Sequence, residues 1–470
     1  YIMVFSSLNF LLIFLPIVLL LHSVLPFKYK NIVLLAASII FYAWGEPRYL
    51  AIMIITILVN YAGAILLDKH YSSRQRLWIV SLTIVLDLSF LFYFKYFNFV
   101  VDNINGVLAT DFQLLDIIMP IGISFYTFQA MSYLIDVYRR EVPAQKDVYK
   151  LALYIVLFPQ LVAGPIVKYH DVCEQIDNRT IEFKNVIIGF KRFITGLAKK
   201  VLIANTLAEV VDKIFAQAPE NLTTGVSWLG AVAYCLQLYY DFSGYSDMAI
   251  GLGLMFGFRF LENFNYPYIS KSITEFWRRW HISLATWFKL YLYIPLGGNR
   301  KGAVRTYWNL FAVFLVTGIW HGAAWSYVAW GIWNGIFIVI ERFFGLDKDK
   351  NDRWYVSAAK HLYAFFAIVW GMIIFRAESL SYAYEYICRM LHIDVTKHLP
   401  DYDYGVNNKF AIMLIVGLIC AMPVCRNLIY IKYERKVQRT LVNIWLFLLF
   451  FWSTISLAAS TYNPFIYFRF

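Results

Sequence analysis

The sequence has few charged residues: Asp, Glu, Lys and Arg fill only 15% of its 470 positions. Soluble domains carry about 25%, whereas 60% of this chain is hydrophobic and its mean hydropathy is +0.57. The shortage of charge therefore excludes an ordinary soluble domain and predicts an integral membrane protein. The recurring apolar stretches have helical length, which predicts an all-α polytopic protein rather than a barrel of alternating strands of roughly ten residues.

Two further absences narrow the class. None of the five cysteines has a metal-like Cys-x-x-Cys spacing, so we expect no metal. No internal repeat is visible, which counts against a transporter built from inverted repeats. The net charge of +12 comes mainly from short loops and interfacial segments. That pattern is typical of cytoplasmic loops, with room for an anionic cofactor, and does not predict nucleic-acid binding.

The basic loops predict the membrane topology of the first third. Lys28 and Lys30, the stretch 68–76, and Arg139 with Arg140 are basic, whereas the loop around Asp102, Asp111 and Asp116 has no Lys or Arg after Lys95. Basic loops tend to stay on the cytoplasmic side of a membrane, which is the positive-inside rule. An external N-terminus followed by five spans satisfies this rule. These predicted spans are Asn9–Leu25, Asn31–Trp44, Tyr49–Leu67, Trp78–Phe94 and Met119–Tyr138.

The sixth apolar segment, Leu151–Val167, contains Pro159 and Pro165 and is expected to form a broken or re-entrant helix. A basic amphipathic segment follows, and its cytoplasmic face would meet either anionic lipid or an anionic cofactor. Its basic residues are Lys184, Lys191, Arg192, Lys199 and Lys200.

Two aspartates lie between short apolar segments. Asp241 and Asp247 separate Trp228–Tyr240 from Ser246–Phe258, and a charge at membrane depth requires a partner. The nearest basic candidates are the arginines at 259, 278 and 279, and a structural ion pair is favoured over catalysis.

With the later apolar stretches the chain reaches about eleven spans in one membrane-embedded domain. We divide this domain, 1–470, into N-terminal helices (1–140), a catalytic core (141–345) and C-terminal helices (346–470).

The stretch Thr274–Trp325 contains the two histidines of interest. His321 ends an apolar run, where burial keeps an imidazole neutral and suited to act as a general base; a satisfied core histidine is the equal alternative. His281 lies beside the apolar stripe of an expected helix that includes Trp277 and Trp287, with a structural role slightly favoured over catalysis or substrate positioning.

Other residues complete the candidate site. Arg278, Arg279, Arg300 and Lys301 are expected to bind phosphate groups of a cofactor. A polar stripe at helical spacing (Gln129, Ser132, Tyr133, Asp136) would either line a tunnel or dock on another helix.

Several motifs together resemble one family. The chain resembles the membrane-bound O-acyltransferases, and within them the bacterial alginate O-acetyltransferase branch. The resemblance covers residues from about 115 to 335 and rests on the segments 120–129 (PIGISFYTFQ), 158–166 (FPQLVAGPI), 240–247 (YDFSGYSD), 276–283 (FWRRWHIS) and 317–322 (TGIWHG).

The resemblance implies a ring of helices around a thinned core of short and re-entrant helices, with funnels from both membrane faces. It implies His321 as the main catalytic residue, His281 as the second, and a substrate tunnel that we assign to Gln129, Tyr133, Asp241 and Trp320.

The implied reaction takes acetyl from cytoplasmic acetyl-CoA, with no permanently bound cofactor. The acetyl group would cross a bacterial inner membrane to an extracytoplasmic Ser-His-Asp (SGNH-like) acetyltransferase and a cell-surface polysaccharide. That polymer would be alginate or a similar exopolysaccharide, with peptidoglycan or another polymer as the alternative. A lipid or sugar transporter, or a scaffold for a polysaccharide synthase, remains as a competing hypothesis.

Overall fold

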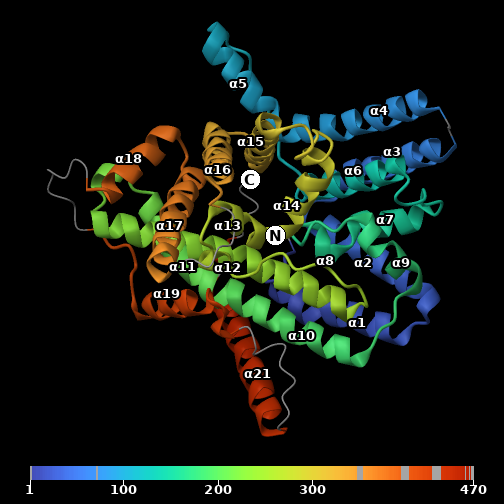
Figure 1. Cartoon of the computed structure of the whole chain (residues 1–470). Coiled ribbons are helices and arrows are strands. Elements are labelled where there is room, and N and C mark those ends of the chain that lie inside the picture. Colours follow the sequence, from blue (N-terminus) through green and yellow to red (C-terminus); the bar gives the residue numbers. More distant parts are fainter. Residues whose placement is uncertain are drawn as a thin grey trace. The chain divides into compact units, whose positions relative to one another are not determined.

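The computed structural model describes residues 3–69, 72–346, 353–392, 402–425, 436–460, 462–464 and 466. Every regular element within these ranges is a helix, which confirms the all-α prediction (Figure 1). The chain forms two compact units. The first holds residues 1–193 and 245–261, and the second holds residues 194–244 and 262–470, so the boundary falls inside two helices, α10 and α12. The division at residues 140 and 345 stays a prediction.

The helices up to α10 have the following bounds: α1 Leu15–Val24, α2 Phe27–Gly45, α3 Leu50–Lys69, α4 Ser73–Leu91, α5 Phe97–Leu108, α6 Ile123–Arg139, α7 Val148–Val156, α8 Phe158–Leu161, α9 Tyr169–Asn178 and α10 Phe183–Ala198. The remaining described helices are α11 Asn205–Phe215, α12 Thr224–Met255, α13 Ile273–Arg279, α14 Ile282–Phe288, α15 Ala303–His321, α16 Trp325–Phe344, α17 Trp354–Arg376, α18 Leu380–Met390, α19 Asn408–Cys420 and α21 Lys436–Ala459.

Four described helical segments are long and apolar enough to cross a membrane: Pro47–Lys69, Ser73–Leu108, Trp354–Arg376 and Thr440–Ala459. Their outward surfaces are apolar; on α4, for example, Trp78, Leu82 and Val85 are 67%, 63% and 60% exposed. Such a surface suits lipid rather than water. The structure therefore agrees with a multi-pass membrane protein, and the count of about eleven spans stays a prediction.

In the first unit, α3, α4 and α6 pack against one another. The amide of Asn60 on α3 donates to both carboxylate oxygens of Asp87 on α4, at 2.9 and 3.0 Å. Both side chains are fully buried, so the hydrogen bonds satisfy a polar pair inside an apolar bundle. The predicted interruption near Pro159 is confirmed, because α7 and α8 are separated by a non-helical Leu157.

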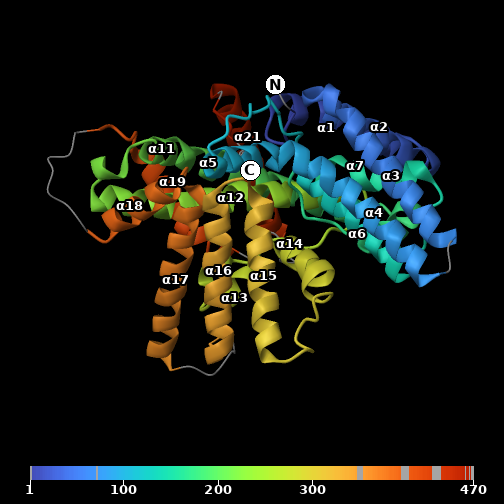
Figure 2. The same ribbon diagram turned by 90° about the horizontal axis from the view of Figure 1, so that it is seen from above.

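In the second unit, α15, α16 and α17 lie side by side (Figure 2). The contact between α15 and α16 is close at Gly318, where an added Cβ would lie 2.4 Å from the carbonyl oxygen of Tyr327. Only glycine permits this approach. The close packing fixes the end of α15, which carries His321.

Three sequence predictions of local structure are wrong. The segments on either side of Asp241 and Asp247 form one continuous helix, α12. The expected single helix through His281 is broken into α13 and α14. The expected loop around Asp102 is partly helical, since α5 includes this residue.

The partners of the two aspartates also differ from the prediction. Asp241 pairs with Lys200 at 2.6 Å, and Asp247 pairs with Arg192 at 2.8 Å. Neither uses the arginines at 259, 278 or 279. The structural ion pair is confirmed, but its cations come from the basic segment predicted to face lipid or cofactor. Lys200 and Arg192 are buried, because α10 and the π-helical turn after it place them against α12.

Candidate functional site

The break between α13 and α14 is held by a network around Asn263. The carbonyl oxygen of its side chain accepts hydrogen bonds from the backbone N–H and the hydroxyl of Ser283, at 3.2 and 2.9 Å. Its backbone carbonyl accepts from the N–H of Ile282 at 3.0 Å. His281, between the two helices, has a left-handed backbone with φ +47°. This conformation is uncommon for a non-glycine residue, so the network maintains a defined bend at His281.

The start of α13 is tied to the neighbouring helices by one carboxylate. Glu341 on α16 is fully buried and accepts from the backbone N–H groups of Ile273 and Thr274 at 2.5 and 2.8 Å. The hydroxyl of Tyr363 on α17 donates to the same carboxylate at 3.1 Å. The first N–H groups of a helix need such acceptors. Glu341 therefore positions α13 relative to α16 and α17.

His281 is 2% exposed and contacts both polar and aromatic groups. Its Nδ1 lies 3.2 Å from the side-chain oxygen of Asn263 and 3.4 Å from the hydroxyl of Ser283. The ring meets the edge of Phe242 at 4.6 Å between centroids. The oxygen of Asn263 can only accept a hydrogen bond, so it favours the tautomer with a proton on Nδ1.

His321 is 7% exposed and lies at the last position of α15. Its ring packs edge to face against Trp320, Trp330 and Phe375, with centroid distances of 5.0, 5.1 and 5.1 Å. Burial among rings disfavours the charged imidazolium, so the side chain is suited to exist neutral and to accept a proton transiently.

A small cavity adjoins His321. Its volume is about 20 Å³, room for one water-sized molecule. Most of its lining is aromatic: Leu238, Phe242, Trp277, Trp280, His321, Trp330, Met372 and Phe375. His281 is not part of the lining. The arrangement can therefore present one imidazole to a small bound group while the second supports the wall from behind Phe242.

The structure brings Trp320 to the two histidines, and the other predicted tunnel residues make contacts of their own. The ring of Trp320 lies 6.5 Å from that of His281 and 5.0 Å from that of His321. Asp241 is in the same unit but bonds Lys200 and accepts from the backbone N–H of Ile466. Gln129 and Tyr133 belong to the first unit and are fully buried on α6.

The predicted polar stripe on α6 is not a separate face, because apolar residues of this helix are buried as completely. The hydroxyl of Tyr133 accepts from the backbone N–H of Gln145 at 2.9 Å, and that of Ser132 donates to the backbone carbonyl of Gln129 at 2.8 Å. The first bond joins α6 to the segment before α7 and the second lies within α6, so both alternatives for the stripe stay predictions.

The four predicted phosphate-binding residues lie near the histidines in the chain and differ in their surroundings. Arg279 pairs with Glu275 at 2.9 Å and donates to the backbone carbonyl of Asn265. Arg278, Arg300 and Lys301 are exposed. The last two lie in the turn before α15, where Gly297, Gly298 and Gly302 have positive φ. Their role in cofactor binding stays a prediction.

Sequence reasoning missed several parts of the site. Asn263 and Glu341 carry no motif signal alone, since their partners lie 18 and 68 residues away. Phe375 lies outside the stretch that resembled a family. Aromatic residues make up 19% of the chain. This enrichment was the one available signal for such a cavity, and it did not identify the residues.

The family comparison covers half of the chain. A model of the membrane-bound O-acyltransferase family matches residues 141–382. This range includes both histidines, Asn263, Glu341 and all residues that line the cavity.

Individual relatives extend the match. The chain is 43% identical to a probable alginate O-acetylase of Pseudomonas putida, over the whole length of both chains. It is 32% identical to a peptidoglycan O-acetyltransferase of Helicobacter pylori, over 93% of this chain and 90% of that protein. It is 28% identical to a teichoic acid D-alanyltransferase of Bacillus subtilis, over 56% of this chain and 70% of that protein.

Proposed function

Because this chain belongs to the membrane-bound O-acyltransferase family, in its alginate O-acetyltransferase branch, we propose that it transfers acetyl from cytoplasmic acetyl-CoA toward a cell-surface polysaccharide. The chain is an acyltransferase and a multi-pass membrane protein. Membership of this family therefore favours an acyltransferase over the transporter and scaffold hypotheses. The donor, the crossing of the membrane and the bacterial inner membrane as location are parts of the proposal.

One observation supports the chemistry above the others: His321 lines a narrow aromatic cavity, whereas His281 bonds Asn263 outside it. We therefore assign His321 as the catalytic base and His281 as the positioning residue. A cavity of about 20 Å³ favours a small acyl group such as acetyl over a long fatty acyl chain. Arg278, Arg300 and Lys301 are exposed and available for the phosphates of CoA.

The proposed reaction is an acyl transfer in one step of bond exchange. His321 takes the proton of an acceptor hydroxyl, and the hydroxyl oxygen attacks the carbonyl carbon of the thioester. The carbon–sulfur bond breaks, the CoA thiolate leaves, and the imidazolium returns the proton to that sulfur. A neutral buried imidazole suits both proton transfers.

The acceptor in the proposal is an extracytoplasmic Ser-His-Asp acetyltransferase, which passes the group to sugar hydroxyls. Coenzyme A is too highly charged to enter hydrocarbon, so the donor stays on the cytoplasmic side. Alginate or an alginate-like exopolysaccharide is the proposed polymer, because the relative that matches over both full lengths, at 43% identity, is named a probable alginate O-acetylase. The peptidoglycan relative supplies the alternative polymer.

The test uses the full chain in a bacterial host that lacks its own copy. His321→Ala is expected to abolish O-acetylation of the exopolysaccharide while the protein remains in the membrane. His170→Ala is the matched control, since the His170 side chain is 64% exposed in the first unit and lies outside the site. Acetyl content is measured by nuclear magnetic resonance on purified polymer. Normal acetylation in His321→Ala would remove His321 from the mechanism.

A second arm tests the donor. Purified protein is given acetyl-CoA labelled in the acetyl group, and release of free CoA is followed. Release that depends on His321 supports the proposed donor. Transport of label into vesicles without any release of CoA would contradict the acyltransfer step.

A further inference from the structure

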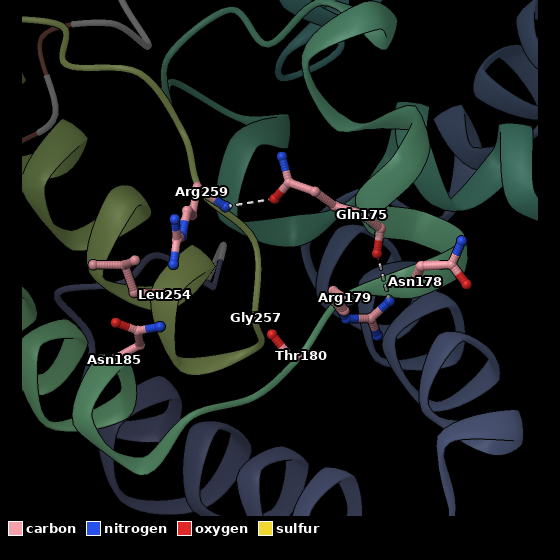
Figure 3. A pocket seen from close by; sticks show the side chains of 8 residues that line it. All are labelled: Gln175, Asn178, Arg179, Thr180, Asn185, Leu254, Gly257 and Arg259. Carbon is pink, nitrogen blue, oxygen red and sulfur yellow. Dashed lines mark hydrogen bonds between the residues drawn. The ribbon is translucent and has the colours of Figure 1, made fainter.

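A polar cavity of about 340 Å³ lies in the first unit, whereas His281 and His321 belong to the second (Figure 3). It is formed by the end of α9, the segment before α10, the first turn of α10, the end of α12 and the loop after α12. Its lining contains two arginines and no carboxylate: Gln175, Asn178, Arg179, Thr180, Asn185, Leu254, Gly257 and Arg259.

Arg179 is 6% exposed, and its charge has no carboxylate partner among the described residues. Its Nε donates to the backbone carbonyl of Phe256 at 2.9 Å, and its Nη1 donates to the side-chain oxygen of Asn31 at 2.6 Å. Its Nη2 is buried and has no hydrogen-bond partner in the described structure. All of its acceptors are neutral, so the positive charge remains uncompensated.

The guanidinium plane is fixed in position. It lies over the rings of Phe258 and Phe27, with distances of 4.5 and 5.3 Å to the centroids. Gly257 has φ +86°, and a Cβ there would lie 3.2 Å from the Cδ of Arg179. Rings and glycine thus hold the guanidinium in one orientation. Burial lowers the pKa of Arg179 to about 10, so the side chain still carries its charge at neutral pH.

A second cation completes the cavity. The side chain of Arg259 is exposed within the lining, and its backbone N–H donates to the side-chain oxygen of Gln175 at 2.8 Å, which fixes the loop. Two carboxylates that are close in sequence, those of Glu174 and Glu182, do not pair with Arg179 or Arg259. Both side chains are exposed and make no ion pair in the described structure. A buried cation left without a counter-ion is costly unless a ligand supplies one.

We propose that this cavity binds a phosphate ester, with the guanidinium groups of Arg179 and Arg259 contacting its oxygens. Asn178, Thr180 and Asn185 supply neutral hydrogen-bonding groups around the same space. Two guanidinium groups with neutral donors match the charge and the several acceptor oxygens of phosphate. The phosphate belongs either to CoA or to a phospholipid headgroup. Only the assignment to CoA rests on the proposed function.

The experiment uses the full chain in phosphatidylcholine nanodiscs and calorimetric titration with CoA, dephospho-CoA and inorganic phosphate. Arg259→Gln removes the exposed cation without disturbing a buried contact. Arg179→Lys keeps the buried positive charge but loses the planar guanidinium group and its paired N–H donors. Arg74→Gln is the matched control, because Arg74 is an exposed arginine of the same unit outside the cavity.

A phosphate from CoA predicts that Arg259→Gln weakens CoA binding about tenfold, the effect of one charge-assisted hydrogen bond. The Arg74→Gln protein should bind CoA like the wild type. If the 3′-phosphate is the bound group, dephospho-CoA should bind more weakly to the wild type and lose nothing further in Arg259→Gln.

A phosphate from lipid predicts another pattern. In nanodiscs that contain phosphatidylglycerol, the wild type should retain this lipid through purification and Arg259→Gln should lose it, as measured by mass spectrometry, with CoA binding unchanged. Either pattern supports the site. Unchanged CoA affinity, unchanged inorganic phosphate affinity and unchanged lipid retention in both arginine variants overturn it.

The test of the phosphate site can be distinguished from the test of the proposed function. If His321→Ala keeps full acetyl transfer while Arg259→Gln still loses CoA or lipid, the catalytic assignment fails and the phosphate site stands. If His321→Ala is inactive and no probe responds to Arg259, the phosphate site alone fails.

Discussion

Both units of the molecule bury cations, and two of these, Lys200 and Arg179, have different partners. Lys200 in the second unit is 2% exposed and lies 2.6 Å from the carboxylate of Asp241, with Asn205 and the carbonyl of Pro464 as further acceptors. Arg179 in the first unit is almost as buried and has only neutral acceptors. The chain therefore supplies a counter-ion for Lys200, whereas the charge of Arg179 stays available to a ligand.

The two cavities show the same contrast. The cavity beside His321 has mostly aromatic walls and a volume of about 20 Å³, and the cavity beside Arg179 is polar and about 340 Å³ in volume. The first suits a small apolar group, and the second suits a charged one.

The largest expected effect concerns the paired cation. Lys200→Met leaves the carboxylate of Asp241 buried without its counter-ion, which should cost about 3–5 kcal/mol of unfolding free energy. Thermal unfolding of the purified protein in detergent measures the loss. Lys200→Met with Asp241→Asn should recover most of it, because the amide oxygen still accepts from the N–H of Ile466. Lys184→Met, an exposed control, should change little; an equal loss there would contradict the comparison.

The next effect concerns Asn263, which orients His281. Asn263→Ala leaves buried donors without acceptors, a cost of about 1–3 kcal/mol, so turnover should fall roughly ten- to hundredfold. CoA affinity should stay near the wild-type value. Asn263→Asp restores the acceptor and should recover part of the turnover. A loss of affinity in place of turnover would mean that Asn263 serves binding instead of positioning.

Cavity size gives a smaller effect. Phe375→Leu shortens one wall beside His321, so the rate with propionyl-CoA should rise about tenfold relative to acetyl-CoA, near the value of one methylene in an apolar pocket. Competition between the two donors measures the ratio. Phe365→Leu is the control, since Phe365 lies on the same helix, is 43% exposed and does not line the cavity. An unchanged ratio in Phe375→Leu would show that this wall does not limit the acyl group.

The smallest effect is electrostatic screening. Raising the salt from about 0.1 to about 1 M shortens the Debye length from about 10 to about 3 Å and should weaken phosphate binding beside Arg259 about three- to tenfold. The Lys200–Asp241 pair is buried, so thermal stability should respond far less. Equal salt sensitivity of binding and stability would remove the distinction between the two cations.

The helical class, the helix interruption near Pro159 and the two histidines were predictable from sequence. Hydropathy marks apolar helices, proline marks a break, and His321 and His281 lie in motifs that resemble a family. The helical class, the membrane-bound O-acyltransferase family and the acyltransferase type are confirmed. The roles of the histidines stay predictions.

The partners in space were not predictable. Asp241 was expected to pair with an arginine nearby in the chain, and it pairs with Lys200, which lies 41 residues earlier in the π-helical turn after α10. The bend at His281 depends on hydrogen bonds to Asn263, 18 residues earlier, which no local propensity encodes. Arg179 was not considered at all, because a single arginine after a short amphipathic helix has no sequence signal.

The environment of the Lys200–Asp241 pair has a consequence for biosynthesis. The N–H of Ile466 donates to Asp241, and Pro464 and Asn463 bond Lys200 and Asn205. A ribosome makes these last partners more than 200 residues after Asp241. Until residue 466 has been synthesised, the Lys200–Asp241 pair therefore lacks these hydrogen bonds. This region of the second unit completes its packing only after that point in translation.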